Sequence, residues 1–217
     1  MRNPLSQKIT GIEPSGIRKF FDIVSEMDDV ISLGVGEPDF DTPWHIRDEG
    51  IYSLERGRTF YTSNAGLKEL REEICRYLSR RCKVDYTIDE ALITVGGSEA
   101  IDLAMRVLLN PGDEVLTFAP YFGEYRAYVT NYDGILKEVE PDTETFQPNL
   151  KKFGQMLSEK TKAVIVNTPN NPTGVVYSEE TIKKLAAIME EKQKELGTEI
   201  YLISDEPYRE LAYDGAE

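Results

Sequence analysis

The stretch VIVNTPNNPTGVVY, residues 164–177, decides how the chain is expected to fold. It begins as a buried strand, breaks into a run of Asn, Thr, Pro and Gly, and ends in another apolar run. Pro and Gly in such a break are typical of a surface turn between two elements. Two asparagines at the mouth of a strand also suit a ligand site, so the turn and the ligand site are both open interpretations.

The sequence around this stretch alternates buried strands with amphipathic helices. Strands are expected at 91–95, 114–120, 134–140, 163–167 and 200–205, and helices at 98–109, 151–157 and 178–196. This alternation predicts an α/β fold, with a mainly parallel sheet covered by helices on both faces. Sheets of this kind bind ligands outside the C-terminal ends of their strands. Before residue 91, the pattern predicts a loose arm, a helix near 17–24, a short strand from 30, and helices at 43–56 and 66–81.

Composition excludes several function classes. The chain has 25 Lys and Arg against 39 Asp and Glu, a formal charge of -14, so nucleic acid and anionic membrane surfaces are not expected partners. Cys75 and Cys82 are the only cysteines, and His45 is the only histidine. No metal site is expected from this set, and two free thiols favour a cytoplasmic location. No segment has the roughly 18 apolar residues of a membrane span.

Two motifs at predicted strand ends suit a phosphate and a cation. In GGSEA, the backbone N–H groups of Gly97, Ser98 and Glu99 open a helix and favour an anion, although a glycine pair before a helix is often only a tight turn. In YLISDEPY, Asp205 ends a strand, where a carboxylate needs a strong donor unless it only caps the next turn. Tyr208 can direct its hydroxyl group into the same crevice.

Two further strand ends complete the predicted crevice. Asn171 and Asp205 are separated by one strand–helix–strand unit, so their strands are expected to lie close together. APYF adds Tyr121 and Phe122, which would either stack on a ligand or pack in the core. A carboxylate, an amide, a phenol and a phosphate cradle together suit a charged heteroaromatic ring with a phosphate arm.

The motifs GVGEPDFDTP, FYTSNAGLKELREEI, GGSEA, NPGDEVLTFAPYF, NTPNNPTG and SDEPY resemble those of the class I/II aminotransferases of fold type I, which use pyridoxal phosphate. The resemblance runs from about residue 31 to 214. It implies that residues 1–42 form an arm and part of a small domain. Residues 43–217 would then be the N-terminal part of the large cofactor-binding domain, whose C-terminal remainder would be absent from these 217 residues.

The resemblance also implies roles for individual residues. Asp205 would pair with the pyridine nitrogen as a catalytic residue, and Tyr208, also counted as catalytic, would bind the phenolic oxygen of the cofactor together with Asn171. The remaining implied contacts are stacking on the ring by Phe122, phosphate binding by the backbone of Gly97, Ser98 and Glu99, a contact from Tyr61 to the phosphate of the neighbouring subunit in a homodimer, and approach of the substrate carboxylate to Gly36.

One departure from the family pattern affects the expected chemistry. The lysine that forms the Schiff base with the cofactor lies in this family beyond the SDEPY loop, and no lysine of these 217 residues stands in a matching motif. The full-length protein is therefore expected to carry the lysine downstream and to be active, whereas this chain alone is not.

The expected function is an aminotransferase that moves an amino group between an L-amino acid and a 2-oxo acid. The sequence does not specify which amino acid is the substrate. Two alternatives stay open: a carbon–sulfur β-lyase on the same scaffold, and a non-catalytic cofactor-binding or interaction module. The acidic balance disfavours a module that binds DNA.

Overall fold

The computed structural model describes residues 4–11, 23, 27, 29–31, 36, 38–213 and 215. The chain divides into two compact units, Met1–Glu13 with Val95–Glu217, and Pro14–Thr94. Most of the predicted helix near 17–24 and of the strand from 30 lies outside the described residues. The domain boundary after Thr42 stays a prediction. No helix in the described part of the chain is both long enough and apolar enough to cross a membrane.

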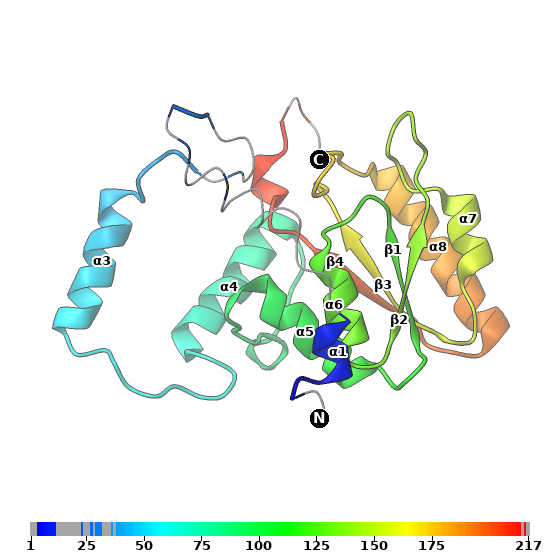
Figure 1. The fold of residues 1–217 in the computed structure, drawn as a ribbon. Helices are drawn as coiled ribbons and strands as arrows, with labels where there is room; N and C mark the ends of the chain where they lie inside the picture. Colours follow the sequence, from blue (N-terminus) through cyan, green and yellow to red (C-terminus); the bar gives the residue numbers. More distant parts are fainter. Residues whose placement is uncertain are drawn as a thin grey trace. The chain divides into compact units, whose positions relative to one another are not determined.

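The larger unit is built on a parallel sheet of four strands, in the order β2-β1-β3-β4 (Figure 1). The strands are β1 (Glu114–Phe118), β2 (Ile135–Val139), β3 (Thr161–Asn167) and β4 (Tyr201–Asp205). The parallel sheet predicted from the sequence is thus confirmed. The expected proximity of the third and fourth strands is also correct, because β3 and β4 are paired and Asn167 stands opposite Asp205 in their register.

Helices cover both faces of the sheet. On one face α7 (Leu150–Met156) and α8 (Glu179–Leu196) enclose a core that includes Leu116 and Phe118 of β1. On the other, α5 (Gly96–Leu108) and α6 (Glu124–Thr130) enclose a core that includes Val115. Successive β1 side chains point to opposite faces, as a strand requires. Burying one aliphatic side chain of this kind stabilises the fold by about 2 kcal/mol.

Local signals explain where the elements of this unit begin and end. Helix α8 begins after Ser178, whose side chain accepts a hydrogen bond from the backbone N–H of Thr181, and it ends at Gly197 with a φ of 65°. The short helix α1 (Gln7–Thr10) is attached by Lys8, whose Nζ donates to the backbone oxygen of Asn131 at 2.9 Å. A 3₁₀ turn, η2 (Arg209–Leu211), follows the site residues at the end of β4.

Two expectations differ from the structure. The strand predicted at 91–95 is wrong, because 91–94 has no regular structure and α5 already begins at Gly96. A strand needs a continuous ladder of backbone bonds to a neighbouring strand, whereas Ala91 N–H donates to the oxygen of Ile88 in a local turn at 3.2 Å and Ile93 N–H donates to the oxygen of Ala65 at 3.0 Å. Helix α6 was not predicted, since seven residues are too few for a clear apolar period.

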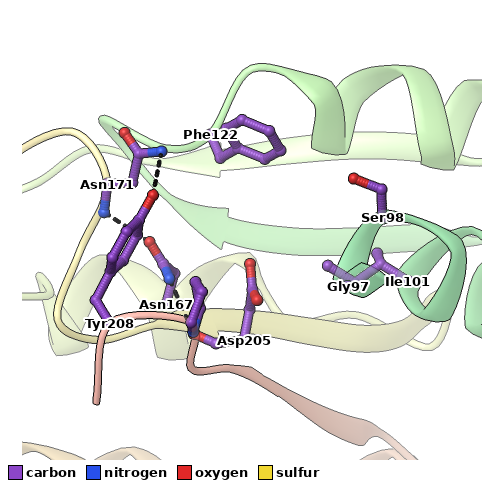
Figure 2. Close-up of a pocket in the computed structure, with 9 residues that line it drawn as sticks. Gly97, Ser98, Ile101, Phe122, Asn167, Asn171, Asp205 and Tyr208 are labelled. Carbon is purple, nitrogen blue, oxygen red and sulfur yellow. Dashed lines mark hydrogen bonds between the residues drawn. The ribbon is translucent and has the colours of Figure 1, made fainter. Parts of the chain in front are cut away.

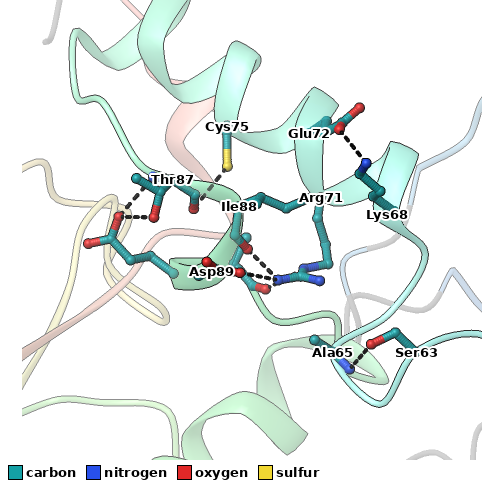
Figure 3. Close-up of polar contacts among 11 residues, drawn as sticks. Ser63, Ala65, Lys68, Arg71, Glu72, Cys75, Thr87, Ile88 and Asp89 are labelled. Carbon is teal, nitrogen blue, oxygen red and sulfur yellow. Dashed lines mark hydrogen bonds and ion pairs between the residues drawn. The ribbon is translucent and has the colours of Figure 1, made fainter.

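The smaller unit contains α3 (Trp44–Glu55), α4 (Lys68–Cys82) and the 3₁₀ turn η1 (Ile88–Glu90). Arg71 of α4 donates through Nε to the backbone oxygen of Ala91 at 2.8 Å. It also donates through a terminal guanidinium nitrogen to the backbone oxygen of Ile88 (Figure 3). Arg71 therefore ties α4 to the segment around η1. Helix α3, by contrast, has no buried residue.

Candidate cofactor site

A pocket of about 170 Å³ lies in the larger unit, between the first turns of α5 and the C-terminal ends of the strands. Four segments of the chain contribute to it: the start of α5, the loop after β1, the end of β3 with its loop, and the end of β4 with its loop. This is the edge of a parallel sheet at which ligands are expected. The lining residues are Gly97, Ser98, Ile101, Phe122, Asn167, Asn171, Asp205, Pro207 and Tyr208.

Asp205 supplies the acidic group of the pocket. It is the last residue of β4, so the strand fixes its backbone, and its side chain is half-buried. One carboxylate oxygen, Oδ2, accepts a hydrogen bond from the phenol of Tyr125, and the side chain lines the pocket (Figure 2). A half-buried carboxylate with this geometry favours a cation or a strong N–H donor in the pocket.

Asn167 connects the ends of β3 and β4. Its side-chain amide donates to the backbone oxygen of Asp205 at 2.9 Å, and its Oδ1 accepts from the backbone N–H of Asn171 at 2.7 Å. The Asn167 side chain is buried, so these bonds satisfy polar groups that water does not reach. Sequence reasoning missed this residue, although an asparagine that ends a run of buried apolar residues is a signal that could have identified it.

Asn171 and Tyr208 form a pair at one end of the pocket. The amide of Asn171 donates to the phenolic oxygen of Tyr208 at 3.3 Å, and the two side chains lie side by side in Figure 2. Both side chains are partly exposed towards the pocket. An amide and a phenol can together donate to one ligand oxygen, so this end of the pocket is suited to a phenolic or phenolate group.

The loop after β3 holds Asn171 in place through its own internal bonds. Asn170 is buried, and its Oδ1 accepts from the hydroxyl group of Thr173 at 2.8 Å while its amide donates to the backbone oxygen of Pro120 at 3.4 Å. Gly174 closes the turn with a φ of 73°, a conformation that favours glycine. The stretch NTPNNPTG is therefore a turn and a wall of the pocket at once.

The first turn of α5 lies at the other end of the pocket. The backbone N–H groups of Gly97 and Ser98 belong to this turn, where a helix supplies no acceptor of its own, and Figure 2 shows the Ser98 hydroxyl group directed into the open space. Glu99 turns its carboxylate back to the backbone N–H of Val95. Its side chain therefore contacts the helix start, and Gly97 and Ser98 are the residues of this turn that line the pocket.

An aromatic ring after β1 forms part of the pocket wall, and two further aromatic rings pack behind it. Phe122 lines the pocket, and its ring meets that of Tyr125 edge-on, with centroids 5.7 Å apart. Tyr121, the second aromatic residue of APYF, instead stacks on Tyr125 at 6.2 Å and donates its hydroxyl group to Glu138 at 2.8 Å. Phe122 thus lines the pocket, whereas Tyr121 packs against Tyr125; stacking of Phe122 on a ligand ring stays a prediction.

The structure brings together most of the predicted site residues. Those that line one pocket are Gly97, Ser98, Phe122, Asn171, Asp205 and Tyr208. Gly36 and Tyr61 belong to the smaller unit, where both are exposed, and their roles stay predictions. The roles of the six pocket residues towards a ligand also stay predictions.

Comparisons with known proteins identify the family of the chain. A family model described as aminotransferase class I and II matches residues 28–217. A Bacillus subtilis protein named as an aminotransferase is 45% identical over 216 residues. A solved structure of aspartate aminotransferase from Thermus thermophilus with maleate matches 100% of the chain, with 36% identity and a TM-score of 0.91. An alanine aminotransferase from Pyrococcus furiosus matches 98% of the chain, with 31% identity and a TM-score of 0.89.

The chain spans about half the length of these relatives. It covers 54% of the Bacillus subtilis protein, 56% of the Thermus thermophilus structure and 55% of the Pyrococcus furiosus structure. The fold type predicted from the sequence is therefore confirmed for the part of the fold that these residues form.

Proposed function

Since the chain belongs to the class I and II aminotransferase family, we propose that the whole protein moves an amino group between an L-amino acid and a 2-oxo acid, with pyridoxal phosphate as its cofactor. The observation that carries this proposal is the pocket itself. It presents a carboxylate from Asp205, an amide–phenol pair from Asn171 and Tyr208, and the first turn of α5 to one space.

The polar groups of the pocket suit three functional groups of the cofactor: its phenolic oxygen, its phosphate and its ring nitrogen. Pyridoxal phosphate carries its phenolic oxygen and its phosphate arm on either side of the reactive carbon, and its ring nitrogen on the opposite side. The pocket offers donors at one end, through Asn171 and Tyr208, and anion-binding N–H groups at the other, through Gly97 and Ser98 (Figure 2). Asp205 lies between these ends and offers an acceptor to the ring nitrogen.

Each residue would have a defined task with the cofactor bound. The cofactor supplies a sink for the electron pair that is released when the bond between the substrate's α carbon and its hydrogen breaks. Asp205 would hold the proton on the ring nitrogen, because its carboxylate is a charged acceptor. Asn171 and Tyr208 would donate to the phenolic oxygen, and Phe122 would cover one face of the ring.

The lysine that the family requires is proposed to lie outside residues 1–217. None of the residues that line the pocket is a lysine. The lysines of α8 lie on a charged surface, where Lys183 and Lys184 pair with Glu179 and Glu180 at 2.6 Å. These pairs support the interpretation of the α8 lysines as a solvated face.

We also propose that the protein is a homodimer in which Tyr61 reaches the phosphate of the partner's site. Trp44, Leu54 and Tyr61 support this proposal, because each is at least 66% exposed within a unit whose α3 helix buries none of its residues. Large exposed apolar patches often mark protein interfaces. The cytoplasmic location stays a prediction. In the described part of the chain, neither Cys75 nor Cys82 forms a disulfide.

The test is an assay of the full-length protein with pyridoxal phosphate, a panel of amino acids and 2-oxoglutarate. Formation of glutamate supports the proposal. Formation of ammonia and pyruvate would instead indicate the β-lyase, and cofactor binding without turnover of any amino acid would indicate a non-catalytic module. The panel also identifies the amino acid, which the pocket residues of this chain do not specify.

A further inference from the structure

The two carboxylate oxygens of Asp205 have different surroundings. Oδ2 accepts a hydrogen bond from the phenol of Tyr125 in α6. Oδ1 faces the first turn of α5, because a Cβ built on Gly97 would lie 4.0 Å from it. Oδ1 is therefore the oxygen nearer to Gly97, which lines the pocket, and it is not the oxygen that Tyr125 occupies.

The Tyr125 ring is enclosed by the protein and packs against two other aromatic rings. Its side chain is completely buried. Its ring is stacked on Tyr121, with an angle of 7° between the planes, and it meets Phe122 edge-on, with an angle of 80°. Tyr121 is in turn bonded to Glu138 of β2, so the position of the Tyr125 phenol is fixed by the aromatic residues after β1 and by β2.

Tyr125 also keeps its proton. Burial, followed by the hydrogen bond to Asp205, raises the pKa of the Tyr125 phenol well above its usual value. The phenol is thus a permanent donor over the pH range in which the protein would work. The carboxylate beside it accepts this bond through one oxygen and keeps the other for a ligand.

We propose that Tyr125 is a positioning residue, which fixes the Asp205 carboxylate through Oδ2 so that Oδ1 is directed at the ring nitrogen of the bound cofactor. This assignment rests on the proposed function. Without this bond the Asp205 carboxylate could rotate, and Oδ1 would point at the ring nitrogen for only part of the time. With the bond, the carboxylate already has the orientation that the ring nitrogen needs. Tyr125 itself does not line the pocket and acts only through Asp205.

A purely structural role is the alternative, because the same bond joins α6 to β4. The variant Tyr125→Phe removes the phenol and keeps the ring. Tyr132→Phe is a matched control, since the phenol of Tyr132 donates to the Asp102 carboxylate at 2.6 Å and neither residue lines the pocket. Both variants lose one phenol–carboxylate bond, but only Tyr125→Phe alters the acceptor for the ring nitrogen.

The experiment compares two ligands that form no covalent bond with the full-length protein. Pyridoxine 5'-phosphate has the ring nitrogen, and its 1-deaza analogue has carbon in that position. We expect Tyr125→Phe to weaken binding of pyridoxine 5'-phosphate by about 10-fold, since bonds to charged groups are worth a factor of this order, and to change binding of the 1-deaza analogue by less than about 2-fold. Tyr132→Phe should change neither affinity.

The outcomes separate this inference from the proposed function. Failure of the wild-type protein to bind pyridoxine 5'-phosphate would overturn both. Binding by the wild type with equal losses for the two ligands in Tyr125→Phe, or with no loss, would overturn the role of Tyr125 alone. If Tyr125→Phe does not fold, 3-fluorotyrosine at position 125 of the otherwise unchanged protein should move the ¹⁵N resonance of the bound ring nitrogen. The same label at position 132 should leave that resonance in place, and equal shifts or none would overturn the role.

Discussion

The side-chain amide of Asn167 donates a hydrogen bond to the backbone oxygen of Asp205, with 2.9 Å between the two atoms, and this bond fixes the ends of β3 and β4 relative to each other. The same side chain accepts from the backbone N–H of Asn171 at 2.7 Å. One buried residue thus sets the spacing between the acceptor proposed for the ring nitrogen and the donor proposed for the phenolic oxygen.

Replacing Asn167 should therefore affect both stability and cofactor binding. Asn167→Ala leaves two backbone groups without their partner, which should lower the free energy of unfolding by about 2–4 kcal/mol and also weaken binding of pyridoxine 5'-phosphate. Asn149→Ala is the control, because Asn149 accepts from the backbone N–H of Lys152 at 3.0 Å and caps α7 instead. The control should lose about 1 kcal/mol and keep its ligand affinity. Unchanged affinity in Asn167→Ala would contradict the coupling.

Asp205→Asn tests the charge at the end of β4. The amide is similar in shape to the carboxylate but is neutral, so it should not keep a proton on the ring nitrogen. We expect kcat to fall on the order of 10²- to 10³-fold with little change in thermal unfolding. Asp102→Asn removes a carboxylate that accepts from Tyr132 outside the pocket and should retain activity. Steady-state kinetics of the wild type, Asp205→Asn and Asp102→Asn would measure kcat. An equal fall in kcat in the two variants would contradict the role proposed for Asp205.

Asn171 and Tyr208 should act as one unit. Their side chains are bonded to each other at 3.3 Å, so each helps to orient the other. Asn171→Ala and Tyr208→Phe should each weaken pyridoxine 5'-phosphate binding about 5-fold, and the double variant should lose less than the product of the two effects. A 3-O-methyl analogue of the ligand should show little effect of either variant. Full additivity in isothermal titration would argue against a shared contact.

Gly66 of the smaller unit should not tolerate a side chain. Its φ is 100°, and an added Cβ would lie 2.4 Å from Cγ1 of Ile93. Gly66→Ala should lower the free energy of unfolding by about 2–4 kcal/mol through strain and overlap. Gly57→Ala isolates the strain, because Gly57 has a φ of 68° with nothing within 4 Å of the added atom, and it should cost about 1 kcal/mol. The measurement is the urea midpoint of unfolding of each variant. Equal shifts for Gly66→Ala and Gly57→Ala would contradict the prediction, because they would mean that the overlap with Ile93 costs nothing.

We expect the protein to lose stability at high pH through the ionisation of Tyr177. Its side chain is 5% exposed, and burial raises its pKa to about 12. The pKa of the Tyr177 phenol is higher in the folded than in the unfolded state, so the phenol ionises first in the unfolded chain. The free energy of unfolding therefore keeps its full value below pH 10 and falls as the pH rises from 10 to 12. The loss should amount to about 2–3 kcal/mol, and Tyr177→Phe should lack this part of the pH dependence. Identical slopes for the variant and the wild type would contradict this assignment.

Much of the larger unit follows from residue pattern alone. All four strands of the sheet and helices α5, α7 and α8 were expected near their observed bounds, because strongly periodic or continuously apolar segments allow few alternatives. The segment 91–95 shows the limit of this reasoning. Its residues favour a strand locally, but a strand also depends on a neighbour, and local sequence does not specify that neighbour.

The sequence predicted some residues of the site and missed others. Asn171 and Asp205 stand at strand ends that the alternation already placed together, so their convergence could be predicted. Asn167 and Tyr125 could not be assigned in the same way, because their roles depend on which backbone oxygen or carboxylate lies opposite them in space. Such pairings depend on register and on the packing of α6, and neither leaves a periodic signal in the sequence.

The position of β4 in the sheet has a practical consequence. Among the described residues β4 pairs with β3 alone, and the side chains of Tyr201 and Leu202 are about half exposed. A strand edge of this kind is a template on which another strand can assemble. When a polypeptide of these 217 residues is produced by itself, its tendency to aggregate should therefore depend on this exposed edge of β4. Aggregation through intermolecular strand pairing is the hazard to control before any binding measurement is interpreted.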